Sequence, residues 1–435
     1  MSKQYLKSEL FLAVGFLAAL AAVPVTQTCI ELARRERVQF TDVFRYRPTA
    51  KNLRQFERTL EEKSWFQQKL RPEMRRLFFR ALRDTGAKAV PGLDGWLFYR
   101  PDLRYLVEPD RPEARASGSK WAGPAESRTR RESVGRAILG FRDQLKARGI
   151  ALVVVPVPGK PSVYPDQVTR RETGRQQDFR SPTLKLIEAL RREGVPTVDL
   201  FAAFGSARAE AGEAGADGPL YLACDTHWTP RGARLAAQAV AARLRELSLV
   251  PEGAREFRTQ RVAVARRGDI LDMMQIPGAR ETFPAEAVTC EQVLDAVSGL
   301  LVPSASDRPG TYRYPGQAAQ VLVLGDSFCR IYQFPEPQSL GDAPAAAVPG
   351  QKDAKSTQRL LPGSAGFLSH LALALKSPVD AIVSDGGAST DVRRKLSTNP
   401  EILEGKKVVV WEFVERDIAL GQNGWEEVPL PAKLD

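Results

Sequence analysis

The segment VLVLGDSF, residues 321–328, decides the fold, because an aliphatic run ends there in a glycine turn that a serine follows. Unbroken Val/Leu runs are typical of strands in a parallel sheet whose two faces are both covered by helices. Comparable runs occur in ALVVVPVPGK (151–160) and KKVVVWEF (406–413), and AIVSDGG (381–387) is also strand-like. The sequence therefore predicts a layered α/β fold.

Helical patterns alternate with these strands along the chain. Residues 230–249 carry apolar side chains at the spacing of one helix face, and VPTVDL (195–200) is expected to add a further strand. Residues 251–318 do not follow the alternation, and we interpret them as an insertion. The expected organisation is an anchor helix (1–30), a helical lead-in (31–91) and one main domain (92–435).

The N-terminus has the pattern of an export segment. Lys3 and Lys7 precede the uncharged run LFLAVGFLAALAAVPV (Leu10–Val25), and the apolar character continues with few polar residues to Ile30. A helix that spans a bilayer needs about 20 apolar residues. We expect an uncleaved membrane anchor, with a cleaved export signal and an ordinary buried helix as the alternatives.

The composition limits the chemistry of the protein. Of the 435 residues 43% are hydrophobic, which is enough for a core, and the net charge is +11. The basic excess fits an anionic partner such as an acidic glycan, and no nucleic-acid partner is expected because no motif for one is found. Two histidines and four cysteines without C-x-x-C spacing exclude a His-rich metal site and a zinc ribbon. We expect neither a metal nor a cofactor.

The two histidines lie in different contexts. His370 belongs to the apolar helical segment GFLSHLALAL and is expected to be packed in the core. His227 belongs to DTHWTP, two residues after Asp225, so in an extended segment both side chains point to one face. A carboxylate there can hold the imidazole tautomer of a general base. Thr229 and Pro230 predict the start of a helix directly after it.

Ser327 follows a buried strand at the edge where parallel sheets gather their ligands. Together Asp225, His227 and Ser327 supply an orienting acid, a base and a nucleophile. A purely structural role of the two motifs is the alternative. Gly, Asp and Ser are common turn residues, and a histidine at a helix entry can serve as a hydrogen-bonding residue.

These motifs and their order resemble the alginate O-acetyltransferase family (AlgJ/AlgX type), which has an SGNH-hydrolase-like domain. In ordinary SGNH hydrolases the GDS segment comes first, whereas here the Asp/His segment precedes it, as in the alginate family. The N-terminal anchor adds to the resemblance. The matching segments are DGWLFY…DL (94–103), VPVPGKPSVYP (155–165), DTHWTPRGA (225–233), GDSFCRIYQ (325–333) and KVVVWEFVERD (407–417).

The resemblance implies a three-layer, flavodoxin-like domain with a mostly parallel sheet. It also implies an O-acetyltransferase that modifies an exopolysaccharide through an acyl-serine at Ser327, with His227 as base and Asp225 as orienting acid. Asp326 is then not the acid of the triad. The implied partners are the exopolysaccharide, the membrane and a membrane-bound O-acyltransferase that supplies acetyl groups.

The resemblance further implies a single-pass protein of the inner membrane with its catalytic domain in the periplasm, or a cleaved periplasmic form. An acetylesterase with the same triad and a non-catalytic polysaccharide-binding or scaffold subunit are the alternative functions.

One part of the SGNH pattern is missing, because no asparagine stands where an oxyanion donor is expected. The candidates for oxyanion or substrate binding are therefore Arg330, Tyr332, Gly386 and Gly387. Aromatic residues near the motifs can stack on sugar rings, although a core position is expected for most of them, with Tyr332 as the best exception. These aromatic residues are Trp228, Tyr332, Phe334 and Trp411.

Two of the cysteines lie close to the motifs. Cys224 precedes Asp225, and Cys329 follows Ser327 by two residues. If the two motifs meet, these cysteines are either two buried thiols, which we favour, or a disulfide of an exported protein.

Overall fold

The computed structural model forms two compact units, residues 1–86 with 275–282 and residues 87–274 with 283–435. The structure describes residues 3–45, 47–107, 124–172, 180–211, 218–299, 302–305, 310–314, 319–333, 363–421 and 424–431.

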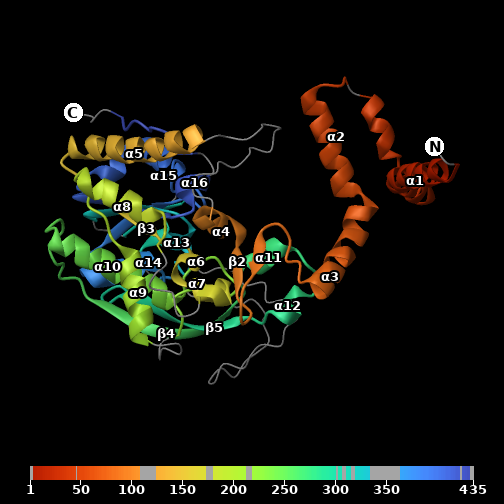
Figure 1. Cartoon of the computed structure of the whole chain (residues 1–435). Helices are drawn as coiled ribbons and strands as arrows, with labels where there is room; N and C mark the ends of the chain where they lie inside the picture. The colour runs from red at the N-terminus through yellow and green to blue at the C-terminus, as the bar shows by residue number, and fades with distance from the viewer. Residues whose placement is uncertain are drawn as a thin grey trace. The chain divides into compact units, whose positions relative to one another are not determined.

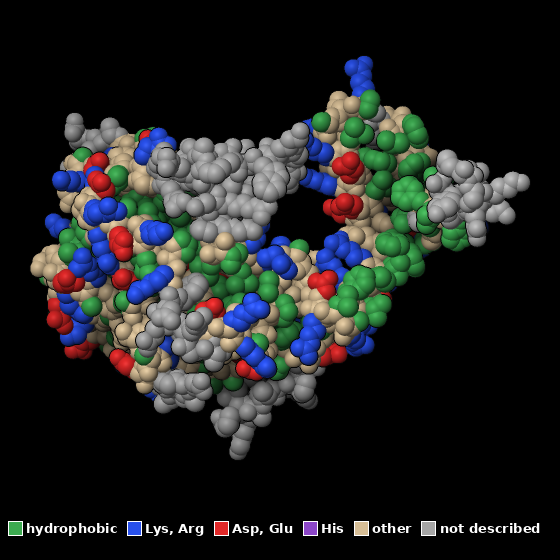
Figure 2. All heavy atoms as spheres, viewed as in Figure 1, with side chains coloured by type: hydrophobic (Ala, Val, Ile, Leu, Met, Phe, Trp, Pro, Cys, Tyr) green, Lys and Arg blue, Asp and Glu red, His purple; other side chains and the backbone are tan. Residues whose placement is uncertain are grey.

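The smaller unit is helical and begins with the long helix α1 (Lys3–Ala33). Among the described residues, its segment Phe11–Ala33 is long and apolar enough to cross a membrane by length and composition. Hydrophobic side chains are exposed along it, for example Phe11 and Leu12, and Figure 2 shows such side chains on this unit. The further helices are η1 (Gln39–Phe44), α2 (Ala50–Lys63), η2 (Phe66–Leu70), α3 (Arg71–Leu82) and α12 (Ala279–Thr282).

The larger unit is built on a six-stranded sheet with the strand order β3-β10-β8-β9-β7-β6. The first four strands run parallel to one another, whereas β7 and β6 are antiparallel to their neighbours. The four parallel strands coincide with the four apolar runs of the sequence, so the predicted α/β fold with a mostly parallel sheet is confirmed. The strands are β3 (Ala151–Val157), β6 (Ser304–Ala305), β7 (Thr311–Arg313), β8 (Val321–Gly325), β9 (Val379–Val383) and β10 (Val408–Val414).

Both faces of this sheet are covered, because alternate strand residues point to opposite sides. Val153 and Val323 belong to the core layer that also contains side chains of α9, α10 and α14. Val154 and Leu324 belong to the opposite layer, with side chains of α5, α8, α15 and α16. Figure 1 shows the ribbons of the helices and of the sheet between them. The bounds are α5 (Pro124–Lys146), α8 (Thr183–Arg192), α9 (Leu200–Ala211), α10 (Pro230–Glu246), α14 (Phe367–Leu375), α15 (Asp391–Ser397) and α16 (Asp417–Leu420).

The segment interpreted as an insertion contributes to both the sheet and a separate ribbon. β6 and β7 lie in it and extend the central sheet. Its other strands, β4 (Phe257–Arg266) and β5 (Glu286–Asp295), form an antiparallel pair, and α11 (Asp269–Met274) follows β4. The remaining elements are β1 (Ala89–Pro91), β2 (Leu97–Tyr99), α4 (Arg100–Val107), α6 (Lys160–Val163), α7 (Pro165–Val168), η3 (Arg170–Glu172), α13 (Ser327–Arg330) and η4 (Pro400–Leu403).

The strand predicted at residues 195–200 is wrong. Only a single parallel bridge forms, between Thr197 and Val154. The amide of Val154 donates to the carbonyl of Pro196, and the amide of Val198 donates to the carbonyl of Val154. The ladder extends in neither direction, because Pro196 has no N–H to donate to β3 and Pro156 of β3 has none to donate back, and the chain continues into α9.

Charged side chains of both signs lie on the visible face of the larger unit. Figure 2 shows Lys and Arg intermixed with Asp and Glu on the visible face of the larger unit. The basic excess therefore forms no single positive patch on this face.

The predicted start of helix α10 is confirmed, and it supports a stability test. The hydroxyl of Thr229 accepts a hydrogen bond from the amide of Gly232 at 3.3 Å and donates to the carbonyl of Pro219 at 2.7 Å. Thr229→Ala leaves the buried amide of Gly232 unpaired and also removes the bond to Pro219, so we expect the free energy of unfolding to fall by about 1–2 kcal/mol. Denaturant titration of the full chain in detergent measures it.

Thr49→Ala is the matched control. Thr49 caps α2 through a hydrogen bond from the amide of Asn52 at 3.2 Å, but it is exposed to solvent. Water replaces the lost partner there, so the cost is smaller. Equal losses for the two variants would contradict the argument from burial.

Candidate active site

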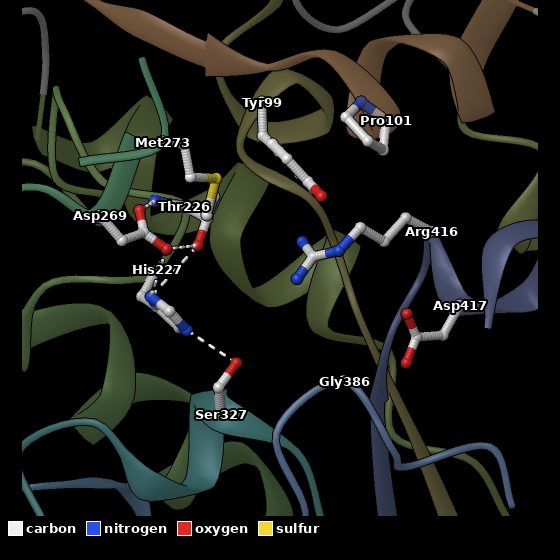
Figure 3. A pocket seen from close by; sticks show the side chains of 10 residues that line it. All are labelled: Tyr99, Pro101, Thr226, His227, Asp269, Met273, Ser327, Gly386, Arg416 and Asp417. Atoms are coloured by element: carbon white, nitrogen blue, oxygen red, sulfur yellow. Dashed lines mark hydrogen bonds and ion pairs between the residues drawn. The ribbon is translucent and has the colours of Figure 1, made fainter. Parts of the chain in front are cut away.

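A cavity of about 270 Å³ lies at the carboxyl edge of the parallel strands (Figure 3). Ser327 follows β8, Gly386 follows β9, and Arg416 and Asp417 follow β10. Ligands of parallel sheets gather at this edge. The residues that line the cavity are Tyr99, Pro101, Thr226, His227, Asp269, Met273, Ser327, Gly386, Arg416 and Asp417.

Ser327 is held in a tight turn directly after β8. The carboxylate of Asp326 caps the short helix α13, because it accepts from the amide of Phe328 at 2.8 Å, and it also accepts from the amide of Val414 at 3.1 Å. The amide of Asp326 in turn donates to Glu412 at 2.9 Å. Asp326 therefore ties the serine turn to the end of β10 and has no hydrogen bond to the histidine in the described part of the chain.

The structure brings the three predicted side chains together in one hydrogen-bonded series. His227 Nε2 lies 2.8 Å from Ser327 Oγ, and His227 Nδ1 lies 2.7 Å from Asp225 Oδ1 (Figure 3 shows the first of these contacts). A carboxylate accepts hydrogen bonds only, so this contact assigns the ring proton to Nδ1. Nε2 is then left as an acceptor for the serine hydroxyl proton.

Asp225 is fully buried, and its carboxylate accepts four hydrogen bonds. Oδ1 also accepts from the amide of His227 at 3.0 Å, and Oδ2 accepts from Arg266 Nε at 3.1 Å and from the amide of Asp269 at 3.2 Å. Burial alone would raise the pKa of Asp225, but the charges of Arg266 and His227 outweigh it and hold the pKa well below its usual range. The carboxylate is therefore ionised at neutral pH.

The two histidines have opposite electrostatic surroundings. Burial opposes the charged form of His227, but the charge and hydrogen bond of Asp225 prevail, so the pKa of His227 is raised above its usual 6.5. His370 is packed inside α14 as predicted, and no described residue pairs with either ring nitrogen. Burial lowers the pKa of His370 to about 4.

Sequence reasoning missed a second acid beside the histidine. The carboxylate of Asp269 accepts from the amide and the hydroxyl of Thr226 at 2.7 and 2.6 Å and lies 3.6 Å from His227 Nδ1. Burial, reinforced by the charge of Asp225, raises the pKa of Asp269 to about 6. Gly268 permits this close approach, because a Cβ there would lie 1.7 Å from the carbonyl oxygen of Cys224.

Lys160 was also missed as a residue that supports the site, although it lies in one of the segments that resemble the family. Its ammonium group is fully buried and donates to three carbonyl oxygens, those of Leu222, Ala223 and Asp225, at 3.0, 2.9 and 2.7 Å. These contacts fix the backbone that leads into the Asp225–His227 segment. Burial lowers the pKa of Lys160 to about 8.

The candidates for oxyanion or substrate binding have different positions. Gly386 lines the cavity, whereas the amide of Gly387 already donates to the carbonyl of Ser384. Arg330 is not among the lining residues and forms an ion pair with Asp385 at 2.8 Å.

The aromatic candidates for sugar stacking are buried where the structure describes them. Tyr332 is fully buried, and its hydroxyl donates to the carbonyl of Trp228 at 3.3 Å, so its ring is closed to a bound sugar. Trp228 itself packs edge-on against Phe328, and Trp411 lies in the core layer of β10. Phe334 lies outside the described residues.

The cysteines are free thiols, as the favoured alternative predicted. Cys224 donates to the carbonyl of Gly95, and Cys329 donates to Glu412 at 3.2 Å, so no disulfide joins the two.

The group Asp225, His227 and Asp269 places its ligand atoms within 4.8 Å of one another. However, Asp225 already accepts four hydrogen bonds, one of them from the guanidinium of Arg266. A second cation beside Arg266 would meet strong repulsion, so these residues suit a hydrogen-bond network better than a metal.

The sequence model of the family described as "SGNH hydrolase-like domain, acetyltransferase AlgX" matches residues 89–361, more than half of the chain. The chain belongs to this family. It is 30% identical over 214 residues to the probable alginate O-acetylase AlgJ of Pseudomonas aeruginosa, which covers 48% of this chain and 47% of the relative. It is 25% identical over 287 residues to the protein of the same name from Pseudomonas syringae pv. tomato, with 64% and 60% covered.

These matches span about half to three fifths of the length of the two relatives. Among solved structures, the O-acetyltransferase domain of Pseudomonas putida AlgJ is similar, with a TM-score of 0.51 and 22% sequence identity over 76% of this chain and 92% of that chain. This likeness concerns the fold. The family resemblance and the SGNH-like fold expected from the sequence are both confirmed.

The electrostatic description of the site can be tested by NMR, because the chain has only two histidines. In the full chain labelled at histidine, we expect one imidazole to titrate above 6.5 and the other near 4. Asp225→Asn removes the charge that raises the pKa of His227, so the upper titration should move down and the lower one should stay. An upper titration unchanged in Asp225→Asn would contradict the assignment.

Proposed function

We propose that the protein is an O-acetyltransferase that acetylates hydroxyl groups of an exported polysaccharide through an acetyl-serine at Ser327. The observation that carries this proposal is the hydrogen-bonded series Asp225–His227–Ser327 at the edge of a cavity. A nucleophile, a base and an orienting acid in contact have the arrangement of a catalytic triad that transfers acyl groups.

In the first half-reaction, Ser327 Oγ attacks the carbonyl carbon of the acetyl donor while His227 Nε2 takes the hydroxyl proton. The tetrahedral intermediate collapses, its bond to the donor oxygen breaks, and His227 returns the proton to that leaving group. In the second half, a sugar hydroxyl gives its proton to His227 as its oxygen attacks the acetyl carbon. The bond to Ser327 breaks, and Oγ recovers the proton. Asp225 stabilises the imidazolium in both halves.

The tetrahedral intermediate needs donors for its oxyanion. We propose the backbone at Gly386, because it lines the cavity that Ser327 faces and has no side chain to block a close approach. The remaining oxyanion donors belong to the backbone of the serine turn in this proposal.

The substrate, partner and location follow from the family in the same proposal. The two relatives carry the name probable alginate O-acetylase, and we propose a polysaccharide of that kind as acceptor. Helix α1 then anchors the chain in the inner membrane, with the larger unit in the periplasm, where a membrane-bound O-acyltransferase supplies the acetyl group. We also propose a division into anchor, lead-in and main domain at residues 1–30, 31–91 and 92–435.

Ser327→Ala tests the nucleophile. In the full chain in detergent, we expect release of acetate from an aryl acetate and acetylation of an alginate oligosaccharide to fall by about 10³-fold or more, because no other group carries the acetyl. Mass spectrometry of the intact protein should also lose the acetyl adduct. Ser397→Ala, which removes an exposed hydroxyl bonded to the Pro429 carbonyl, is the control and should keep full activity. Undiminished activity in Ser327→Ala would overturn the proposal.

The pH dependence tests the base. His227 accepts a proton only when neutral, so the rate should fall as pH drops through its pKa, which lies above 6.5. Asp225→Asn lowers that pKa, so the acid limb of the profile should move to lower pH while the plateau falls by roughly 10³-fold. The measurement is the rate of acetate release between pH 5 and 9, a range that spans ordinary histidine titration. A profile with the same acid limb in both proteins would exclude His227 as the base.

A further inference from the structure

The wall formed by the end of β10 carries polar groups that the acyl-transfer steps do not use. Asp417 is 6% exposed and lines the cavity, and its Oδ2 is buried without a hydrogen-bond partner among the residues that the structure describes. A buried carboxyl oxygen without a partner is costly, so such a group usually meets a water or a ligand.

Arg416 stands beside it and also lines the cavity. Its Nη1 pairs with Asp102 at 2.9 Å, and its guanidinium lies 5.4 Å from the ring of Tyr99. In Figure 3 the guanidinium points toward the side of the cavity that holds His227 and Ser327. The pairing with Asp102 fixes the side chain and leaves the rest of its planar fork available to a ligand.

The charges of this wall do not favour an anion. Two carboxyl groups, Asp102 and Asp417, accompany the one guanidinium of Arg416, so the wall has no positive excess. Burial raises the pKa of Asp417 to about 7, with Arg416 opposing the shift, so its carboxyl group can donate as well as accept near neutrality. Neighbouring donors and acceptors are what sugar hydroxyls require, and the half-buried ring of Tyr99 offers an apolar surface for the C–H face of a pyranose.

We propose that Arg416, Asp417 and Tyr99 form the subsite that holds the acceptor sugar ring through its hydroxyl groups. The sugar's own carboxylate, where the polymer is acidic, points away from this wall. The inference rests on the proposed function and adds to it the residues that select a sugar hydroxyl over water as the acceptor.

The test compares two fates of the acetyl group in the full chain. An aryl acetate is the donor, and released acetate is measured against acetyl transferred to an alginate oligosaccharide. We expect Asp417→Ala to lower the ratio of transfer to hydrolysis by about tenfold or more, chiefly through a higher KM for the oligosaccharide. Asp417→Asn keeps the shape and an acceptor oxygen, so its ratio of transfer to hydrolysis should lie between those of the wild type and Asp417→Ala. Asp391→Asn, which removes a carboxylate from α15 outside the cavity lining, should leave the ratio unchanged.

A second measurement does not depend on turnover. Calorimetric binding of the oligosaccharide to the Ser327→Ala chain should weaken in the double variant with Asp417→Ala. The same oligosaccharide with its carboxylates reduced to alcohols should bind the Ser327→Ala chain within about threefold of the parent, because hydroxyls make the contacts.

The outcomes separate the two proposals. A folded Asp417→Ala chain with an unchanged transfer ratio and unchanged binding overturns the subsite and leaves the O-acetyltransferase intact. Loss of binding on carboxylate reduction also overturns it. A wild-type chain that neither releases acetate nor transfers it overturns the proposed function, and the binding measurements then decide the subsite alone.

Discussion

The candidate site depends on one buried, ionised carboxylate, that of Asp225. A charge removed from water in this way is tolerated only when donors surround it, and here four hydrogen bonds and the cation of Arg266 do so. The donors come from three places: the histidine segment itself, the end of β4 and the start of α11. The ribbon that looks like an insertion therefore holds the acid in place, and the acid holds the tautomer of His227.

The serine reaches this acid–histidine pair from 100 residues further along the chain. Its position is fixed by the buried strand β8 and by Asp326, which binds the end of β10 through the amide of Val414. Phe328 completes the junction, since its ring lies 4.8 Å from that of His227 and 5.0 Å from that of Trp228. His227 lies shortly before α10 and Ser327 begins α13, so these elements hold the two side chains in contact before any substrate is bound.

The sequence was informative where local chemistry determines local structure. Aliphatic runs marked the parallel strands, and the spacing in D-T-H-W-T-P placed His227 just before a capped helix. It was uninformative where a contact joins distant segments: nothing in R-R-G-D-I marks Arg266 or Asp269 as neighbours of Asp225, and a lysine in a turn does not reveal that it will bind three carbonyls. The strand predicted at residues 195–200 also failed for a local reason. Pro196 and Pro156 lack the N–H groups that a longer ladder needs, and the apolar content of the segment does not show this.

In the proposed mechanism, transfer and hydrolysis compete for the same acetyl-serine. Ser327 and His227 cannot decide it, because they treat the proton of water and that of a sugar hydroxyl alike. A hydroxyl held in a near-attack position reacts as if present at roughly 10⁵ M or more, far above any concentration of free water. The deciding feature must therefore be the surface that orients the acceptor, and the described cavity offers Arg416 and Asp417 on a wall that the proton transfers leave unused. A transferase and an esterase of this fold would then differ at the end of β10 and share the triad.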